Sequence, residues 1–462
     1  MGFHNELVTI LALAGATIID GRGGPPVSDG VVLIQDGRIT AVGPRSAVSI
    51  PAGARVLDLR GRYLTPAFVN TNAHLTPYFG FEDFQGPDSL LVLEAVEGLR
   101  TAFGHGILTI RDTYGILPVL LAVRSRAAAG PEPLPRLLVA GNILGWGGPW
   151  SYSFAGSGGD RPANPFQQWV RGALVQEMGE ELVQLTPDSL RARVRQYLAR
   201  DPDFLKIGVT THLARPSFLL FSPSALEAIV QEARRAGRRT DAHAESVEGL
   251  RMAVAAGVEV LQHPETAGGG LIPQDLLRDI ASRGVVCAMM PDGITGTAWE
   301  EFADHLAMGG RMWPAEGPPS YMARLADSLR RAGVDPLSRP RTPSVQSFEN
   351  RRTNAIGLIR AGCRVAIATD EVVGLPGKSN GRFGSAYPAA LAGLVELGMT
   401  PMQAIVAATR NGAYAAGLEH ELGTIEPGRH ADLLVFGTSP LENIRNAARP
   451  EMIIRAGRVI PR

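Results

Sequence analysis

Three histidines, one lysine and one aspartate lie at or near the ends of short apolar segments that are spread along most of the chain. Taken singly, each has an ordinary structural explanation. A histidine in a strand is often a core residue, the lysine can pair with Asp203, and the aspartate can cap a loop. Taken together, imidazoles and a carboxylate that converge on one place form a donor set for a divalent cation of the zinc or cobalt type. The five residues are His74, Lys206, His243, His263 and Asp370.

The segments that carry these residues alternate with helical patterns. One such pattern, 222–237, opens with Ser-Pro and closes on glycine, which are the usual start and stop signals of a helix. Eight apolar segments that alternate with helices match the strand count of a (β/α)8 barrel, in which the carboxyl ends of the strands meet at one face. The predicted strands are 65–70, 106–112, 136–141, 203–208, 240–244, 258–263, 285–290 and 364–370.

Both ends of the chain have a different pattern. The first sixty residues are β-branched runs broken by Gly, Pro and an Asp-Gly turn, and the end returns to β character in GTIEPGRHADLLVFG and EMIIRAGRVI. We expect these end segments to pair in one small β domain. The predicted organisation is therefore a β domain from 1–62 and 419–462 around a barrel at 63–418.

Two segments interrupt the barrel pattern, near 142–185 and 291–344, and each follows a predicted strand. All five tryptophans of the chain lie in them. Long insertions can use tryptophan for small cores of their own, or they can form an apolar lid over a substrate pocket. The lid interpretation makes four tryptophans candidates for substrate contact: Trp146, Trp150, Trp299 and Trp313. His212, which follows the fourth predicted strand, is a separate candidate.

Composition excludes several classes of protein. Lys plus Arg is 45 and Asp plus Glu is 45, so no overall basic charge favours nucleic-acid binding. Two cysteines, Cys287 and Cys363, cannot form a disulfide framework or a thiolate zinc site. No apolar stretch approaches the roughly 18 residues of a membrane span, and the start MGFHNE lacks the basic region of a signal peptide. We expect a cytoplasmic protein without nucleic-acid or membrane partners.

The residues around these positions resemble the amidohydrolase superfamily, in its imidazolonepropionase-like branch. GRYLTPAFVNTNAHL, LKIG, DAHA, LQHPE and IATDE resemble the family's metal-binding strands, and residues 411–444 are similar to its closing segment. The resemblance covers nearly the whole chain and guides the choice of the eight strands among the short apolar runs. It implies a distorted TIM barrel with a β-sandwich built from both termini.

The sequence departs from the family in its first strand. The family ordinarily has His-x-His there, whereas this chain has Asn72-Ala73-His74, with Asn70 where an acidic residue is usual. An amide oxygen is a poorer donor than imidazole for zinc-like metals. The site can keep two metals with one position weakened, keep one metal, or be inactive. Because the other ligand positions remain, we favour two metals. Asn-x-His resembles the motif of hydrolases that act on thiocarbamates and phenylureas.

The resemblance implies one or two divalent ions (cobalt, zinc or manganese) held by Asn72, His74, Lys206, His243, His263 and Asp370. It also implies that Lys206 is N6-carboxylated and bridges the ions, and that Asp370 is the catalytic proton acceptor. The expected reaction is hydrolysis of a carbonyl–nitrogen or carbonyl–sulfur bond by metal-activated hydroxide.

The expected substrate is small, neutral and apolar, of the thiocarbamate, carbamate or phenylurea type. The alternatives are another amidohydrolase reaction (a dipeptidase, an N-acyl amino acid hydrolase or a deaminase) and a non-enzymatic scaffold that has lost its ligands. A homo-oligomer is compatible with the sequence, which leaves the oligomeric state open.

Overall fold

The computed structural model describes residues 10–76, 88–148, 151–155, 165, 168, 172, 175–212, 217–300, 344–373 and 383–461. Trp150, Trp169 and Trp313 lie outside these ranges, as does most of the predicted insertion at 291–344. No helix among the described residues is long and apolar enough to cross a membrane.

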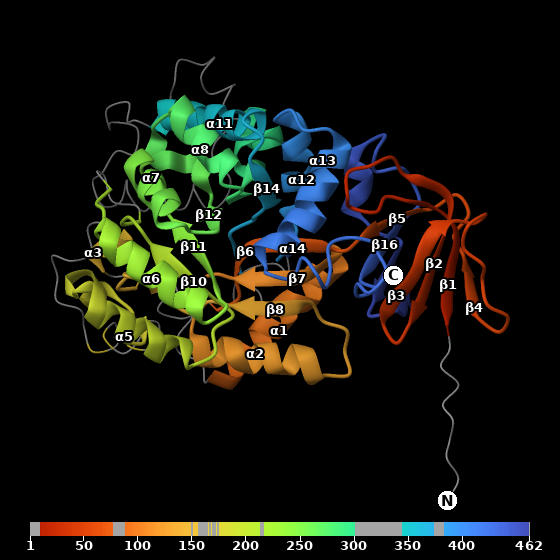
Figure 1. Cartoon of the computed structure of the whole chain (residues 1–462), viewed down its shortest axis with the longest axis horizontal. Coiled ribbons are helices and arrows are strands. Elements are labelled where there is room, and N and C mark those ends of the chain that lie inside the picture. Colours follow the sequence, from red (N-terminus) through yellow and green to blue (C-terminus); the bar gives the residue numbers. More distant parts are fainter. Residues whose placement is uncertain are drawn as a thin grey trace, which may run out of the picture.

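Strands from both ends of the chain form one sheet of eight strands, at one end of the molecule in Figure 1. Strand β16 pairs antiparallel with β5 and so joins the C-terminal strands to the N-terminal ones, as the sequence predicts. Apolar side chains of both ends, among them Ile18, Leu64 and Val435, pack in one buried cluster. The strands are β1 (Leu11–Ile18), β2 (Val27–Gln35), β3 (Arg38–Pro44), β4 (Arg55–Asp58), β5 (Tyr63–Pro66), β16 (Leu433–Phe436), β17 (Met452–Arg455) and β18 (Arg458–Pro461).

The middle of the chain forms two parallel sheets. One has the order β15-β6-β7-β8 and the other the order β14-β13-β12-β11-β10-β9. The first contains β6 (Phe68–His74), β7 (Ile107–Asp112), β8 (Arg136–Val139) and β15 (Glu371–Val372); the second contains β9 (Ile143–Leu144), β10 (Phe204–Gly208), β11 (Arg239–His243), β12 (Val260–Gln262), β13 (Val286–Met289) and β14 (Arg364–Ile367).

Backbone hydrogen bonds link the edges of the two sheets. At one edge the amide of Asp203 donates to the carbonyl of Val139, and at the other the amides of Thr369 and Asp370 donate to the carbonyl of Asn72. Among the described residues the ladders remain two sheets. The predicted α/β class with parallel strands is confirmed, whereas the closed barrel and the β-sandwich stay predictions.

Helices alternate with these strands and cover them (Figure 1). Their apolar faces pack in one large core against the strand side chains that point away from the donor set, such as Leu205 and Ile207 on either side of Lys206. Local signals account for several ends: Ser222 caps α6 by accepting from the amide of Ala225, and Thr400 forms a capping box with Gln403. The helices are α1 (Asp88–Gly104), α2 (Leu117–Ala129), α3 (Tyr152–Ala155), α5 (Pro187–Leu198), α6 (Pro223–Arg235), α7 (Val247–Ala256), α8 (Gln274–Ser282), α11 (Ser344–Arg360), α12 (Tyr387–Glu396), α13 (Pro401–Val406) and α14 (Gly412–Ala415).

The predicted first strand needs a correction. Residues 65–70 belong to two strands, because Tyr63–Pro66 pairs with β16 in the terminal sheet and the chain then enters β6 at Phe68. His74 is consequently the last residue of β6 and does not follow the strand. Proline lacks the amide hydrogen that a continuous central strand requires, which explains why the chain changes sheet at Pro66–Ala67.

Candidate metal centre

Four residues of the predicted donor set lie at the carboxyl ends of parallel strands or within three residues after them, and the fifth, Lys206, lies in the middle of its strand. His74 ends β6, Lys206 lies within β10 and His243 ends β11. His263 follows β12 and Asp370 follows β14 by three residues. Because these strands run in the same direction in each sheet, their carboxyl ends meet on one side of the molecule.

Two close contacts join four of these side chains in two pairs. His74 Nε2 lies 2.9 Å from Asp370 Oδ1, and His243 Nδ1 lies 3.1 Å from His263 Nε2. Burial opposes ionisation of Asp370, but the hydrogen bond to His74 and the nearby charges hold the pKa of its carboxyl well below the usual range. Asp370 is therefore a carboxylate at neutral pH and is able to bind a cation.

Lys206 is joined to Asn72 through a threonine. Lys206 Nζ donates to Thr113 Oγ1 at 3.1 Å, and the Thr113 hydroxyl donates to Asn72 Oδ1. Burial lowers the pKa of Lys206, partly offset by the nearby carboxylates of Asp370 and Asp241. The amine is therefore shifted toward the neutral form that can react with carbon dioxide. Thr113 follows β7 directly, but as an uncharged residue it carried no signal in the sequence.

Below the donor set lies a buried ion pair that the sequence analysis missed. The guanidinium of Arg111 donates to both carboxylate oxygens of Asp241 at 2.8 Å, and Gln262 Nε2 donates to the same carboxylate at 2.6 Å. Asp241 pairs with Lys206 in the register of β10 and β11. An arginine and an aspartate inside the apolar segments GILTIRD and TDAHA were the signal that could have revealed the pair.

Two site residues adopt a backbone conformation that side chains other than glycine rarely take. The φ angle is +38° at His263 and +55° at Asp370. Such left-handed conformations cost about 1–3 kcal/mol and persist where the surrounding structure imposes them, commonly at functional sites. His263 directly follows β12, and Asp370 lies between β14 and β15.

An aromatic wall lines the site beside His243. The ring of Trp146 meets His243 edge to face, with centroids 4.5 Å apart, and stacks on His212 at 5.1 Å. Phe154 packs against Trp146 and His212. Tyr114 contacts both Trp146 and His74. Of the predicted substrate contacts, Trp146 and His212 therefore lie beside the donor set.

The remaining tryptophan among the described residues lies elsewhere. Trp299 stacks on Phe348 of α11, with centroids 5.8 Å apart and the guanidinium of Arg352 over its ring. A substrate contact by Trp299, Trp150 or Trp313 stays a prediction.

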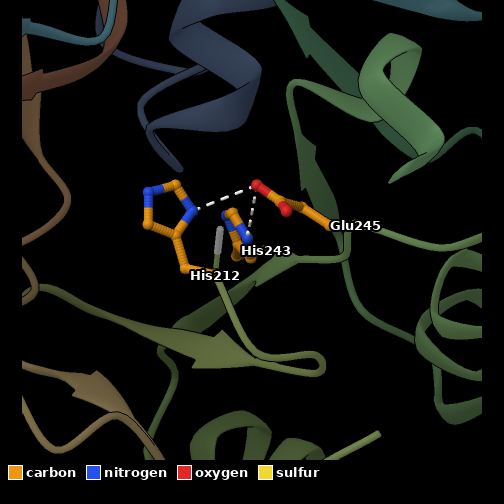
Figure 2. A group of neighbouring side chains, drawn as sticks. All are labelled: His212, His243 and Glu245. Carbon is orange, nitrogen blue, oxygen red and sulfur yellow. Dashed lines mark hydrogen bonds and ion pairs between the residues drawn. The ribbon is translucent and has the colours of Figure 1, made fainter. Parts of the chain in front are cut away.

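Figure 2 shows a carboxylate that lies against two of these histidines. Glu245 Oε1 is 3.0 Å from His212 Nδ1 and 3.5 Å from His243 Nε2. One ligand atom from each of the three residues lies within 4.8 Å of the others. The sequence analysis ranked His212 only as a substrate contact and did not consider Glu245.

The donor set has the chemistry that a divalent ion requires. Burial lowers the pKa of His263 to about 4 and lowers that of His243 as well, so both imidazoles are neutral, as metal ligands must be. His243 Nε2 and His263 Nδ1 are buried and have no hydrogen-bond partner among the described residues. The two facing nitrogens, His243 Nδ1 and His263 Nε2, lie 3.1 Å apart, which is about the separation of two donor atoms on one ion and fits a metal site.

Comparisons with known proteins agree with this chemistry. A model of the amidohydrolase family matches residues 63–460. Two solved structures are similar over nearly the whole chain. Molinate hydrolase has a TM-score of 0.81 and 27% identity and covers 98% of this chain and 95% of that chain. Phenylurea hydrolase B has a TM-score of 0.79 and 28% identity, and the match covers 98% of this chain and 97% of that chain.

Relatives of known function include ochratoxinase of Aspergillus niger, which is 25% identical over 451 residues, 93% of this chain and 82% of that protein. Imidazolonepropionase of Symbiobacterium thermophilum is 26% identical over 454 residues, 93% of this chain and 91% of that protein. The resemblance drawn from the sequence, including the imidazolonepropionase-like branch, is confirmed.

Proposed function

Because the chain belongs to the amidohydrolase family, we propose that it is a metal-dependent hydrolase that cleaves a carbonyl–nitrogen or carbonyl–sulfur bond of a small neutral apolar substrate. The observation that carries the proposal is a group of five ionisable side chains from positions up to 296 residues apart, four of them buried and the fifth, Asp370, partly exposed. The four buried residues are His74, Lys206, His243 and His263. Residues this distant in sequence come together at the ends of parallel strands, where such folds place their active sites.

The same proposal includes the finer architecture. Strands β6 to β8 and β10 to β14 form a distorted (β/α)8 barrel within 63–418, and 1–62 with 419–462 form a β-sandwich, to which β5 (Tyr63–Pro66) adds one strand. The backbone hydrogen bonds that link the two parallel sheets at both edges support the barrel.

One or two ions of cobalt, zinc or manganese are held by two groups of residues, with two ions as the favoured arrangement. His243 and His263 would hold one ion, and Asn72 with His74 would hold the other. Lys206, as its N6-carboxylate, would be a ligand shared by the two ions, and its depressed pKa supports this modification. Bound ions supply nucleophilic hydroxide at neutral pH and polarise the substrate carbonyl.

The protein's own residues move the proton and orient the substrate. Asp370 accepts the proton of the attacking water and passes it to the departing nitrogen or sulfur, while its contact with His74 holds it in position. Trp146 and His212 pack against the apolar part of the substrate and exclude water from the carbonyl.

Thiocarbamates, carbamates and phenylureas are the proposed substrate class. The similarity to molinate hydrolase and phenylurea hydrolase B supports this class, and so does an uncharged wall of Tyr114, Trp146 and Phe154. A panel that also contains dipeptides and N-acyl amino acids tests the choice. Faster turnover of the charged substrates contradicts it and favours the alternative amidohydrolase reactions.

The carboxylated lysine has a sharp test, because the chain contains two lysines, Lys206 and Lys378. In protein equilibrated with ¹³C-bicarbonate we expect one carbamate carbon signal that Lys206→Ala removes and Lys378→Arg retains. Lys206→Ala should also abolish activity and reduce metal content, and short carboxylic acids should restore part of both. A fully metallated Lys206 without a carbamate signal contradicts the proposal.

A further inference from the structure

A second group of metal donors lies beside the proposed site and shares one residue with it. Its three atoms are His212 Nδ1, His243 Nε2 and Glu245 Oε1 (Figure 2). Donor atoms that lie about 2 Å from a tetrahedral ion stand roughly 3.3 Å from one another. The measured separations from Glu245 Oε1, 3.0 Å to His212 and 3.5 Å to His243, lie on either side of that value.

His243 has one ring nitrogen on each side of this arrangement. Its Nδ1 lies 3.1 Å from His263 Nε2. Its Nε2 is buried, faces Glu245 and has no hydrogen-bond partner among the described residues. A buried ring nitrogen that faces a carboxylate without a hydrogen bond is costly. A cation between them supplies the partner that His243 Nε2 lacks.

The other two donors are held in place by contacts of their own. The backbone amide of His212 donates to the carbonyl of Ser153 at 2.7 Å, and its ring stacks on Trp146. The backbone amide of Glu245 donates to Thr210 Oγ1 at 2.8 Å. The carbonyl of Thr210 in turn accepts from Trp146 Nε1 at 2.9 Å. Donors positioned by their surroundings need little rearrangement to bind an ion.

Exposure rises outward through the group. The side chain of His243 is 2% exposed, that of Glu245 10% and that of His212 26%. The carboxylate and the outer imidazole therefore lie between solvent and the buried histidines. An ion that approaches from solvent meets a carboxylate and an accessible imidazole before it reaches His243 and His263.

We propose that His212, Glu245 and His243 form an accessory binding position for a divalent ion of the zinc or cobalt class, through which metal enters the buried site. The inference rests on the proposed metal dependence of the enzyme. His243 serves both positions through its two nitrogens, so an ion can pass from Nε2 to Nδ1 by exchanging Glu245 and His212 for His263.

Metal loading of the full chain tests this position. Chelator-stripped protein is mixed with Co²⁺, the rate of loading is followed by the visible absorbance of bound cobalt, and the final content is measured by elemental analysis. We expect His212→Asn and Glu245→Gln to slow loading about tenfold and to leave the final content of the buried site unchanged. Wild-type loading rates in both variants overturn the proposal.

The chain offers a matched control. His430 is also paired with a carboxylate, Glu421 at 3.2 Å, and its side chain is 27% exposed. Among the described residues, no third donor completes a metal-binding group with this pair. His430→Asn should load cobalt at the wild-type rate. Equal slowing in this control overturns the proposal, because the effect then belongs to any exposed histidine–carboxylate pair.

A measurement on the wild-type protein covers the case in which a variant folds poorly. Crystals soaked in Co²⁺ should show anomalous density between His212, His243 and Glu245, and its absence at saturating cobalt contradicts the accessory position.

These experiments distinguish failure of the accessory position from failure of the proposed function. Slow loading in the variants without turnover of any panel substrate leaves the accessory position standing, whereas turnover with unchanged loading leaves only the proposed function.

Discussion

Asp241→Asn is expected to destabilise the protein strongly, because it leaves the charge of Arg111 buried without a counter-ion. The two side chains are at most 1% exposed and share two hydrogen bonds of 2.8 Å. Removing one partner of such a buried pair costs about 3–5 kcal/mol. An exposed pair gives the contrast: Arg283 and Asp279 are 51% and 40% exposed, and Asp279→Asn should cost less than about 1 kcal/mol.

Urea unfolding followed by tryptophan fluorescence measures the difference. With a slope of about 3 kcal/mol per molar urea, Asp241→Asn should lower the unfolding midpoint by roughly 1 M or more. The double variant Arg111→Met/Asp241→Leu should recover most of the loss, since it removes both charges from the interior. A midpoint shift no larger than that of Asp279→Asn refutes the argument that this pair is a buried, mutually dependent unit.

Three further predictions concern the proposed metal site, the aromatic wall beside it and the terminal sheet. Asn72→His adds an imidazole to the proposed weaker metal position and should slow the loss of metal to a mild chelator. If Asn72→Ala keeps its full metal content and full activity, Asn72 is not a metal ligand. Trp146→Ala should raise KM for neutral apolar substrates roughly tenfold through lost aromatic packing, and an equal rise for charged substrates contradicts the proposed role. Asp432, buried beside Arg455 and Arg136, has a pKa lowered from 3.8: burial opposes ionisation, but the two guanidinium groups outweigh it. Its contribution to stability is present above pH 3.8 and is lost as the pH falls through the lower folded value, so Asp432→Asn should flatten the fall in melting temperature between pH 5 and pH 2, and an unchanged slope contradicts this.

Much of the architecture could be predicted because its signals are local. The alternation of apolar segments with capped helices can be recognised within windows of about ten to fifteen residues. In α6, for example, Ser222-Pro223 marks the start of the helix. The five ionisable residues at strand ends could be found because charge is rare inside apolar segments and needs a reason to be there. The change of sheet at Pro66–Ala67 was missed, since TPAFVN has one continuous apolar pattern.

The sequence by itself determined which residues carry donor atoms suited to a metal ion, and it predicted that these residues lie near the ends of strands. Only the tertiary structure decided which of them touch. Thr113 reaches Asn72 and Lys206, and Glu245 reaches His212, because strand register and loop paths bring together atoms from residues 33 to 93 positions apart. No local pattern encodes such pairs, because they depend on how separate strands align side by side and on where the chain turns after each of them.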